Sequence, residues 1–365
     1  MTPEGDPRER LTGLAALFRQ QARACAELGS PMYAGILTRM SEDLLSGGVV
    51  ADVLACDEAD ALLAAYEKDL PSSAVALRLM GSVHRLVLEG RAPGLARFFP
   101  SAGGRADVEG AWPATVAVLE EHRDELRAGL AQAPQTNEIG RAAALLGGLL
   151  HVRARHPLPV RLLEVGASAG LNLRADHFRV SLREGSGIGP ETSPVVLTEP
   201  WEGRRPPLGG GIEVVERAGC DTAPLDPTTT DGQLRLTSYV WPDQVERLER
   251  LRGALELAAR VPATLVRQGA AAFLRHVELA PGATTVVWHS VMLQYLPAEE
   301  QTAMVARIEE LGEQATAAMA LAHLRLEPET RGGRHAFFVV LRTWPGGEER
   351  VLGTAHPHGV PTTWT

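Results

Sequence analysis

The sequence predicts an α/β fold in which an all-α N-terminal domain precedes a doubly wound, mostly parallel sheet with an antiparallel C-terminal hairpin. Residues 8–155 contain amphipathic segments separated by Gly, Pro and Ser, with almost no alternation of β-branched residues. That pattern indicates helices. After Pro159 short β-type runs alternate with helical stretches, which is typical of a parallel sheet covered by helices. We therefore expect a helical domain over residues 1–155 and a sheet domain over residues 156–365.

Three segments of the N-terminal part illustrate the helical pattern. Residues 11–28 carry apolar side chains at helical spacing and end at Gly29-Ser30-Pro31, and Val75–Leu88 has the same pattern. Gly and Pro just after the last apolar residue are helix-ending signals. A third helix is expected over residues 138–152, with Thr136 as its N-cap.

The elements expected after Pro159 follow from short apolar runs, helical periodicity and turn residues. In chain order they are a strand at Val160–Val165, an inserted hairpin within about residues 178–211, a strand at 212–215 that ends in Gly219-Cys220-Asp221, a helix at 243–259, strands at Thr264–Arg267 and 284–289, a helix at 299–311, a strand at 319–326, and a closing pair at 336–344 and 350–354.

Composition limits the classes of partner. The net charge is −9, and no basic block occurs, whereas nucleic-acid binding needs clustered positive charge. The polar N-terminus lacks a secretory pattern, and no apolar run is long enough for a membrane span. The 3 cysteines are far apart and form no C-x-x-C pair, so neither a disulfide framework nor a zinc cluster is expected. We expect a cytoplasmic protein with a small-molecule partner, no nucleic acid and no membrane.

The segment from Glu164 to Gly170 fits two different patterns. Gly166-Ala167-Ser168-Ala169-Gly170 spells G-x-S-x-G, the turn that holds the nucleophilic serine of many hydrolases. In those enzymes the strand before the serine lies inside a sheet that earlier strands have begun, whereas here only helical segments precede it. Asp226 and His356 or His358 do follow Ser168 in the hydrolase order, so a serine hydrolase remains an alternative.

The same letters preceded by Glu164 resemble motif I of the class I S-adenosylmethionine-dependent methyltransferases, written D/E-x-G-x-G-x-G, with Ser168 in place of the middle glycine. The resemblance implies a Rossmann-like fold and S-adenosylmethionine as cofactor. It also implies that Glu164 holds the methionine amino group, while Gly166, Ala167, Ser168 and Gly170 pass beneath the cofactor. A loop of this kind belongs between the first strand and a helix N-terminus.

An acid at the end of the second strand is the next part of that resemblance. Asp221 lies in a G-x-D-x-x-P segment, which is similar to the family's ribose-binding acid, and a carboxylate suits two adjacent hydroxyl donors. Removal of the insertion at about residues 178–211 leaves a spacing from Glu164 of about 20 residues, as in a simple β-α-β unit. Glu199, at the end of an apolar run within the insertion, is the competing candidate.

Two later segments complete the resemblance. Gln268-Gly269 follows the third strand where the family carries an adenine-binding acid, so Gln268 departs from the pattern while keeping an acceptor and a donor for adenine. Residues 285–296 are similar to the segment that faces the transferred methyl group. Within it His289 is our candidate base, because histidine has a reference pKa near neutrality, with Tyr295 as the second catalytic candidate and Gln294 as a substrate contact.

A polar run before the first strand supplies further candidates. Asn137 and Arg141 lie at the start of an apolar helix, where a guanidinium and a helix N-terminus suit a carboxylate on cofactor or substrate. Gln135, together with Tyr33 and His84 from the helical domain, is expected to contact the substrate. We expect no metal site, because His356 and His358 lack the further ligands that a metal needs.

Several longer motifs together resemble a bacterial family known only as a domain of unknown function, DUF2332. They are Gln135-Thr-Asn-Glu-x-x-Arg141, Glu164-Val-Gly-Ala-Ser-Ala-Gly-Leu-Asn-Leu173, Trp241-Pro-Asp-Gln244 and His356-Pro-His-Gly359. This resemblance extends over nearly the whole chain and implies no activity. The predicted function, methyl transfer to an O or N atom of a small molecule, therefore depends on the local motifs, with a serine hydrolase or a non-catalytic Rossmann-like binding protein as alternatives.

Overall fold

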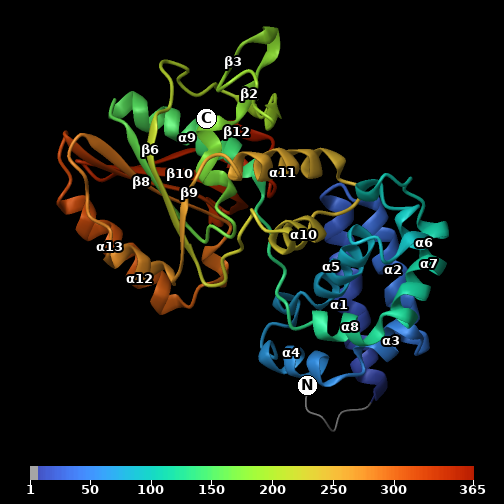
Figure 1. The fold of residues 1–365 in the computed structure, drawn as a ribbon. Coiled ribbons are helices and arrows are strands. Elements are labelled where there is room, and N and C mark those ends of the chain that lie inside the picture. The colour runs from blue at the N-terminus through green and yellow to red at the C-terminus, as the bar shows by residue number, and fades with distance from the viewer. Residues whose placement is uncertain (1–6) are drawn as a thin grey trace. The chain divides into compact units, whose positions relative to one another are not determined.

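The computed structural model describes residues 7–365 and shows a mixed α/β protein with an N-terminal helical region (Figure 1). By internal contacts the chain divides into two compact units. Unit 1 comprises Met1–Thr136, described from Pro7 onward, and Gln233–Leu248, while unit 2 comprises Asn137–Gly232 and Glu249–Thr365. The first division falls at Thr136 rather than at the predicted position 155, so the helix before the first strand lies in unit 2. None of the described helices combines the length and apolar character needed to span a bilayer.

Unit 1 is built from helices around one apolar core. Its helices are α1 Pro7–Glu27, α2 Pro31–Ser46, α3 Val49–Leu54, α4 Asp57–Ala65, α5 Val75–Leu88, α6 Pro93–Ala96, α7 Val108–Glu121 and α8 Arg123–Gly129, with 3-10 turns η1 Leu70–Ser73 and η2 Pro100–Ala102. The start of α2 shows how local sequence sets a boundary: Ser30 caps it by accepting from the Tyr33 backbone N–H, and a cap residue followed by proline favours a helix start. Two further helices, α10 Thr230–Ser238 and α11 Val245–Ala258, contain residues of both units.

Unit 2 contains a mostly parallel sheet, which within the described residues has nine strands in the order β5-β12-β11-β10-β9-β8-β1-β6-β7. These strands are β1 Val160–Val165, β5 Trp201–Gly203, β6 Val214–Asp221, β7 Thr264–Arg267, β8 Ala283–Ser290, β9 Met319–Arg331, β10 Arg334–Trp344, β11 Glu348–Ala355 and β12 Thr362–Trp364. The strands from β9 across to β7 are parallel, and β10 is antiparallel to both β9 and β11.

The insertion differs from the single hairpin that we predicted. It contains η5 Arg183–Gly185 and a separate sheet of β3 Gly187–Ile188, β2 Arg179–Ser181 and β4 Val196–Thr198. It also supplies β5, which pairs in parallel with β12 at the edge of the large sheet. The predicted limits of the insertion therefore enclose one strand of the main sheet.

Helices cover both faces of the large sheet. On one face Leu163, Val165 and Val287 pack with α12 Ala270–Arg275 and α13 Ala298–Glu313, which lie side by side in Figure 1. On the other face α9 Ala142–Arg155 packs against β9 and β10. Gly148 of α9 permits this packing, because a Cβ at that position would lie 2.3 Å from a methyl group of Leu324.

Candidate functional site

The end of β1 holds a buried acid with an incomplete set of partners. Glu164 is 3% exposed, and its Oε2 atom has no hydrogen-bond partner among the described residues. Burial raises the pKa of Glu164 to about 8, and the side chain of Trp288 and the charge of Arg174 oppose that rise. A buried carboxyl group with an unpartnered oxygen is unusual in a folded protein, and it favours a ligand donor at this position.

The loop after Glu164 has a left-handed backbone at three positions. Gly166, Ser168 and Gly170 have φ angles of 70°, 53° and 64°, a region that glycine occupies freely and serine rarely. Asp221, at the end of the adjacent strand β6, holds the loop through an Oδ2 atom that accepts from the Ser168 backbone N–H at 2.9 Å. Ala167 N–H donates to the Cys220 carbonyl at 2.9 Å. The loop is therefore fixed to the end of β6, as expected for the first two strands of the predicted site.

The helix that we expected directly after this loop is absent from the described residues. The chain forms instead the 3-10 segment η4 Leu171–His177, with non-helical backbone angles at Arg174. The Arg174 guanidinium donates to the carbonyls of Gly170 at 2.6 Å and Val261 at 2.7 Å. The α-helix predicted to begin after this loop is therefore replaced by a 3-10 segment.

The polar run before α9 is joined to this loop. The Asn137 side-chain oxygen accepts from the Leu171 N–H at 2.8 Å, and the Asn172 amide donates to the Glu138 carbonyl at 3.1 Å. Thr136 is not the cap: Glu138 accepts from the Gly140 N–H, and the 3-10 turn η3 Ile139–Arg141 precedes α9. Asn137 thus positions the loop, a role that explains a polar residue beside an apolar helix without any ligand.

Arg141 lies at the start of α9, close enough to Glu164 for its charge to lower the pKa of that carboxyl group. Its guanidinium donates to the carbonyls of Pro357 at 3.1 Å and Ser290 at 3.4 Å. It therefore connects the end of β8 with the C-terminal segment. Arg141 and Glu164 thus lie near each other at the carboxyl edge of the sheet.

The proposed ribose and adenine residues lie on neighbouring strands. Asp221 is half-buried, and its Oδ1 atom accepts from the Ala223 N–H at 2.9 Å. The Gln268 backbone N–H donates to the Asp221 carbonyl at 3.0 Å, which places Gln268 and Gly269 beside it. Glu199 instead forms an ion pair with Arg183 in the insertion, and this contact favours Asp221 over Glu199 as the ribose ligand.

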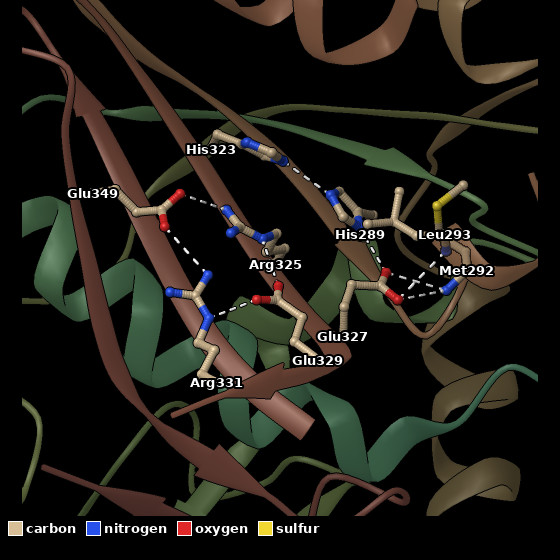
Figure 2. Close-up of polar contacts among 9 residues, drawn as sticks. All are labelled: His289, Met292, Leu293, His323, Arg325, Glu327, Glu329, Arg331 and Glu349. Carbon is tan, nitrogen blue, oxygen red and sulfur yellow. Dashed lines mark hydrogen bonds and ion pairs between the residues drawn. The ribbon is translucent and has the colours of Figure 1, made fainter. Parts of the chain in front are cut away.

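His289 occupies a buried polar cluster rather than a ligand-facing position (Figure 2). Its Nδ1 atom lies 2.7 Å from Glu327 Oε1, and its Nε2 atom lies 2.9 Å from His323 Nε2. Glu327 also accepts from the backbone N–H groups of Met292 and Leu293. Burial and the neighbouring His289 hold the pKa of His323 well below its usual value. Both ring nitrogens of His289 are engaged within the described protein.

The register of the sheet separates His289 from Glu164. Glu164 lies opposite Trp288 in the β1–β8 pair, and Val165 lies opposite His289. Because successive side chains alternate between faces, His289 shares the face of Val165, while Glu164 lies on the α9 face. The expectation that His289 acts as a base on a ligand held by Glu164 is therefore corrected, because the two side chains lie on opposite faces of the sheet. Glu327, 38 residues further along the chain, was missed because no local motif marks it.

The other predicted catalytic and substrate residues have different environments. Tyr295 and Gln294 lie in the 3-10 turn η6 Leu293–Tyr295, and Tyr295 is 73% exposed. Gln135 is half-buried in a segment without regular structure in unit 1. Tyr295 and Gln294 are therefore accessible to a ligand of unit 2, as a substrate contact requires.

Tyr33 and His84 belong to the interior of unit 1. The Tyr33 hydroxyl donates to the Met80 carbonyl at 3.3 Å. The ring nitrogens of His84 contact the Ser238 carbonyl at 3.1 Å and the Ser101 hydroxyl at 2.8 Å, and burial lowers the pKa of His84 to about 4. These contacts give both side chains a structural role, so the expectation that they reach a substrate is corrected.

The arrangement around Ser168 lacks the contact that a serine nucleophile requires. Its hydroxyl is buried and has no hydrogen-bond partner among the described residues. Asp226 accepts instead from Thr228, and the rings of His356 and His358 pack together at 5.4 Å between centroids. Within the described part of the chain no Ser-His-Asp chain of hydrogen bonds therefore forms at Ser168. Within residues 7–365 no group of three or more His, Cys, Asp or Glu residues is arranged to hold a metal ion.

Comparison with known proteins gives one family. The family model described as "Uncharacterized protein conserved in bacteria (DUF2332)" matches residues 15–364. No curated protein sequence matches the chain significantly. The match covers both units and every site residue discussed above.

Proposed function

We propose that this chain, which belongs to the DUF2332 family, is an S-adenosylmethionine-dependent methyltransferase that acts on an O or N atom of a small molecule. The observation that carries the proposal is the buried Glu164 carboxyl group with its unpartnered Oε2 atom at the end of β1. The amino group of the methionine moiety is a donor that would satisfy this oxygen. The sequence resemblance assigns the same role to the same residue.

The order of the parallel strands supports a Rossmann-like site. Strands β7, β6, β1, β8 and β9 are consecutive neighbours, so Glu164 and Asp221 end adjacent strands at the edge where doubly wound sheets bind ligands. Each Asp221 oxygen accepts one backbone N–H and keeps a second lone pair. Asp221 therefore has the acceptors for two ribose hydroxyls without giving up its contact with the loop.

The remaining roles follow from position. Bound S-adenosylmethionine supplies an activated methyl group for in-line displacement, and the protein mainly aligns the acceptor with it. Gln268 and Gly269 lie beside Asp221 for the adenine, and Arg141 lies beside Glu164 for the methionine carboxylate. Tyr295 and Gln294 are accessible for the acceptor. His289 is enclosed by Glu327 and His323, so the proposal no longer uses it as a base.

The state of Glu164 gives the proposal a measurable signature. With a pKa of about 8, Glu164 is mostly protonated at pH 6 and must release a proton to pair with an ammonium group. The α-amino group itself has a pKa of about 8. Affinity for S-adenosylhomocysteine should therefore peak near pH 8 and fall on both sides. 5′-Methylthioadenosine, which lacks the amino group, should show no such peak.

Isothermal titration calorimetry tests the proposal directly. The wild-type protein should bind S-adenosylmethionine and S-adenosylhomocysteine, and Glu164→Gln should weaken both by about tenfold or more, since a charge-assisted contact contributes about 1.5–3 kcal/mol. Glu329→Gln, an acid on the opposite face of the same sheet, is the matched control and should bind normally. Absence of heat with either ligand, or an unchanged affinity in Glu164→Gln, would reject the proposal.

One observation favours the non-catalytic alternative. His289, the histidine of the fourth-strand segment and the candidate base, is fully buried in a cluster with internal partners. A binding protein that keeps the cofactor loop but lacks a base would show this arrangement. Cofactor binding without methylation of any O or N acceptor would support it.

A further inference from the structure

A cavity in unit 2 lies apart from the loop at Glu164. Its volume is about 390 Å³. Six apolar side chains from α9, from the insertion and from the segment before β6 line it: Leu146, Leu150, Phe178, Ile188, Leu208 and Ile212. Ile212 precedes the first residue of β6, whereas Asp221 is the last. The cavity is thus at the opposite end of this strand from the proposed ribose ligand.

One polar side chain in this lining lacks a partner. The Asp176 side chain is only 9% exposed, and its Oδ2 atom forms an ion pair with Arg217. Its Oδ1 atom is buried and has no hydrogen-bond partner among the described residues. Burial also raises the pKa of Asp176. An unpartnered buried oxygen costs stability, and a ligand that donates a hydrogen bond would recover it.

The charges nearby define the ligand. Arg217 already pairs with Asp176, His177 lies 3.6 Å from the same carboxylate, and the Arg153 guanidinium lies next to Gly210 of the lining. A cationic amine would meet these positive groups, whereas a hydroxyl donates a hydrogen bond without adding charge. The lining otherwise requires an apolar body, and a cavity of this volume suits a small organic molecule.

We propose that this cavity binds a neutral alcohol or phenol with an apolar body, whose hydroxyl donates to Asp176 Oδ1. The two requirements come from separate observations, the apolar lining and the unpartnered oxygen. The inference does not depend on the proposed methyltransferase activity, because the two sites share no residue. Failure of one proposal therefore leaves the other unaffected.

2-Naphthol is a suitable probe, since it has two fused apolar rings and a single hydroxyl group. Calorimetry and saturation-transfer NMR on the full chain should detect its binding without S-adenosylmethionine. 2-Methoxynaphthalene, which keeps the rings but cannot donate, should bind about fivefold to tenfold more weakly, the loss expected for one hydrogen bond. Equal binding of the two compounds would overturn the role of Asp176.

The matched variants are two exposed leucines. Leu208 lines the cavity and is 38% exposed, and Leu45 of α2 in unit 1 is 48% exposed. Because neither is in a core, Leu208→Asp and Leu45→Asp should both fold, which circular dichroism verifies. Leu208→Asp should weaken 2-naphthol binding at least about fivefold through loss of apolar contact, and Leu45→Asp should leave it unchanged. No binding to the wild type, or equal binding to both variants, would reject the proposal.

Discussion

Two buried glutamates of the same sheet have opposite environments. Glu327 of β9 is 1% exposed, and its carboxylate contacts His289 and the backbone N–H groups of Met292 and Leu293. Glu164 of β1 is 3% exposed, and its Oε2 atom has no partner in the described chain. Burial is the same in both cases, whereas hydrogen bonding is complete in only one.

This difference separates structure from function at two positions that look alike in sequence. A buried acid with all its partners fixes the chain around it, and here Glu327 holds the turn after β8. A buried acid without them destabilises the fold, and such groups cluster at sites where a ligand completes the contacts. Glu164 is therefore the better candidate for function, although His289 of the Glu327 cluster has the more reactive side chain.

The largest expected loss in the free energy of unfolding is that of replacing Glu327. Glu327→Ala leaves the His289 Nδ1 atom and two backbone N–H groups without their acceptor, so we expect a loss of about 3–5 kcal/mol in the free energy of unfolding. Urea denaturation followed by circular dichroism measures it. Glu329→Ala is the control. Its carboxylate is half-buried and pairs with Arg325 and Arg331 (Figure 2), and its loss should cost about 1 kcal/mol or less. Similar losses in the two variants would remove the contrast.

The second prediction concerns Glu164, the buried acid with an unpartnered oxygen. Its replacement should increase the free energy of unfolding, whereas replacement of Glu327 should decrease it. The pKa of Glu164 is raised from 4.5 to about 8, so the fold favours the protonated form and loses stability as pH rises from about 4.5 to 8. Glu164→Gln removes that dependence. It should unfold like the wild type at pH 4 and be more stable by on the order of 5 kcal/mol at pH 9. A constant difference across this range would contradict the unsatisfied environment of Glu164.

The third prediction concerns the acid pH dependence of stability that arises from His323, which contacts His289 in the Glu327 cluster. Burial and the adjacent His289 lower the pKa of His323, so its contribution to stability is complete above the unfolded value of 6.5 and is lost as pH falls below it. The stability of the wild type should decrease by up to about 1.4 kcal/mol per pH unit from this group between pH 6 and 5. His323→Gln should reduce the slope, and His335→Gln, an exposed control, should not. Equal slopes in the two variants would rule out this linkage.

The fold was predictable where local pattern decides it. β1, β7 and α5 have their predicted bounds, because apolar runs and helical spacing end at clear turn residues. β5 and β12 have three residues each and pair Trp201 with Thr362. Such strands exist only through contacts between distant segments, so no local signal marks them. The 3-10 segment η4 likewise depends on hydrogen bonds that it donates to Asn137 and Glu138.

The sequence predicted which residues of the candidate site lie at the ends of strands. It did not predict on which face of the sheet each side chain lies. Glu164 is the second-last residue of the first predicted strand and Asp221 the last of the second, and the structure places the two strands side by side. The face of His289 depends on its register with Val165, which no pattern in β8 alone reveals. Its partner Glu327 lies in a strand that was predicted to end at residue 326, so the cluster fell one residue beyond the expected element.

The smallest effect is expected in the loop beside Glu164. Ser168 has a φ of 53°, and its buried hydroxyl is unpartnered among the described residues. Ser168→Gly should therefore change the free energy of unfolding by no more than about 1 kcal/mol, with a gain rather than a loss, because glycine adopts this backbone without strain. Ser168→Leu should fold poorly or lose affinity for S-adenosylhomocysteine through steric overlap.

A fluorophosphonate probe should label neither the wild type nor Ser168→Gly, since the hydroxyl lacks a base. Labelling of the wild type that disappears in Ser168→Ala would show instead that the loop holds a nucleophile, and the unpartnered Glu164 would then need a different explanation.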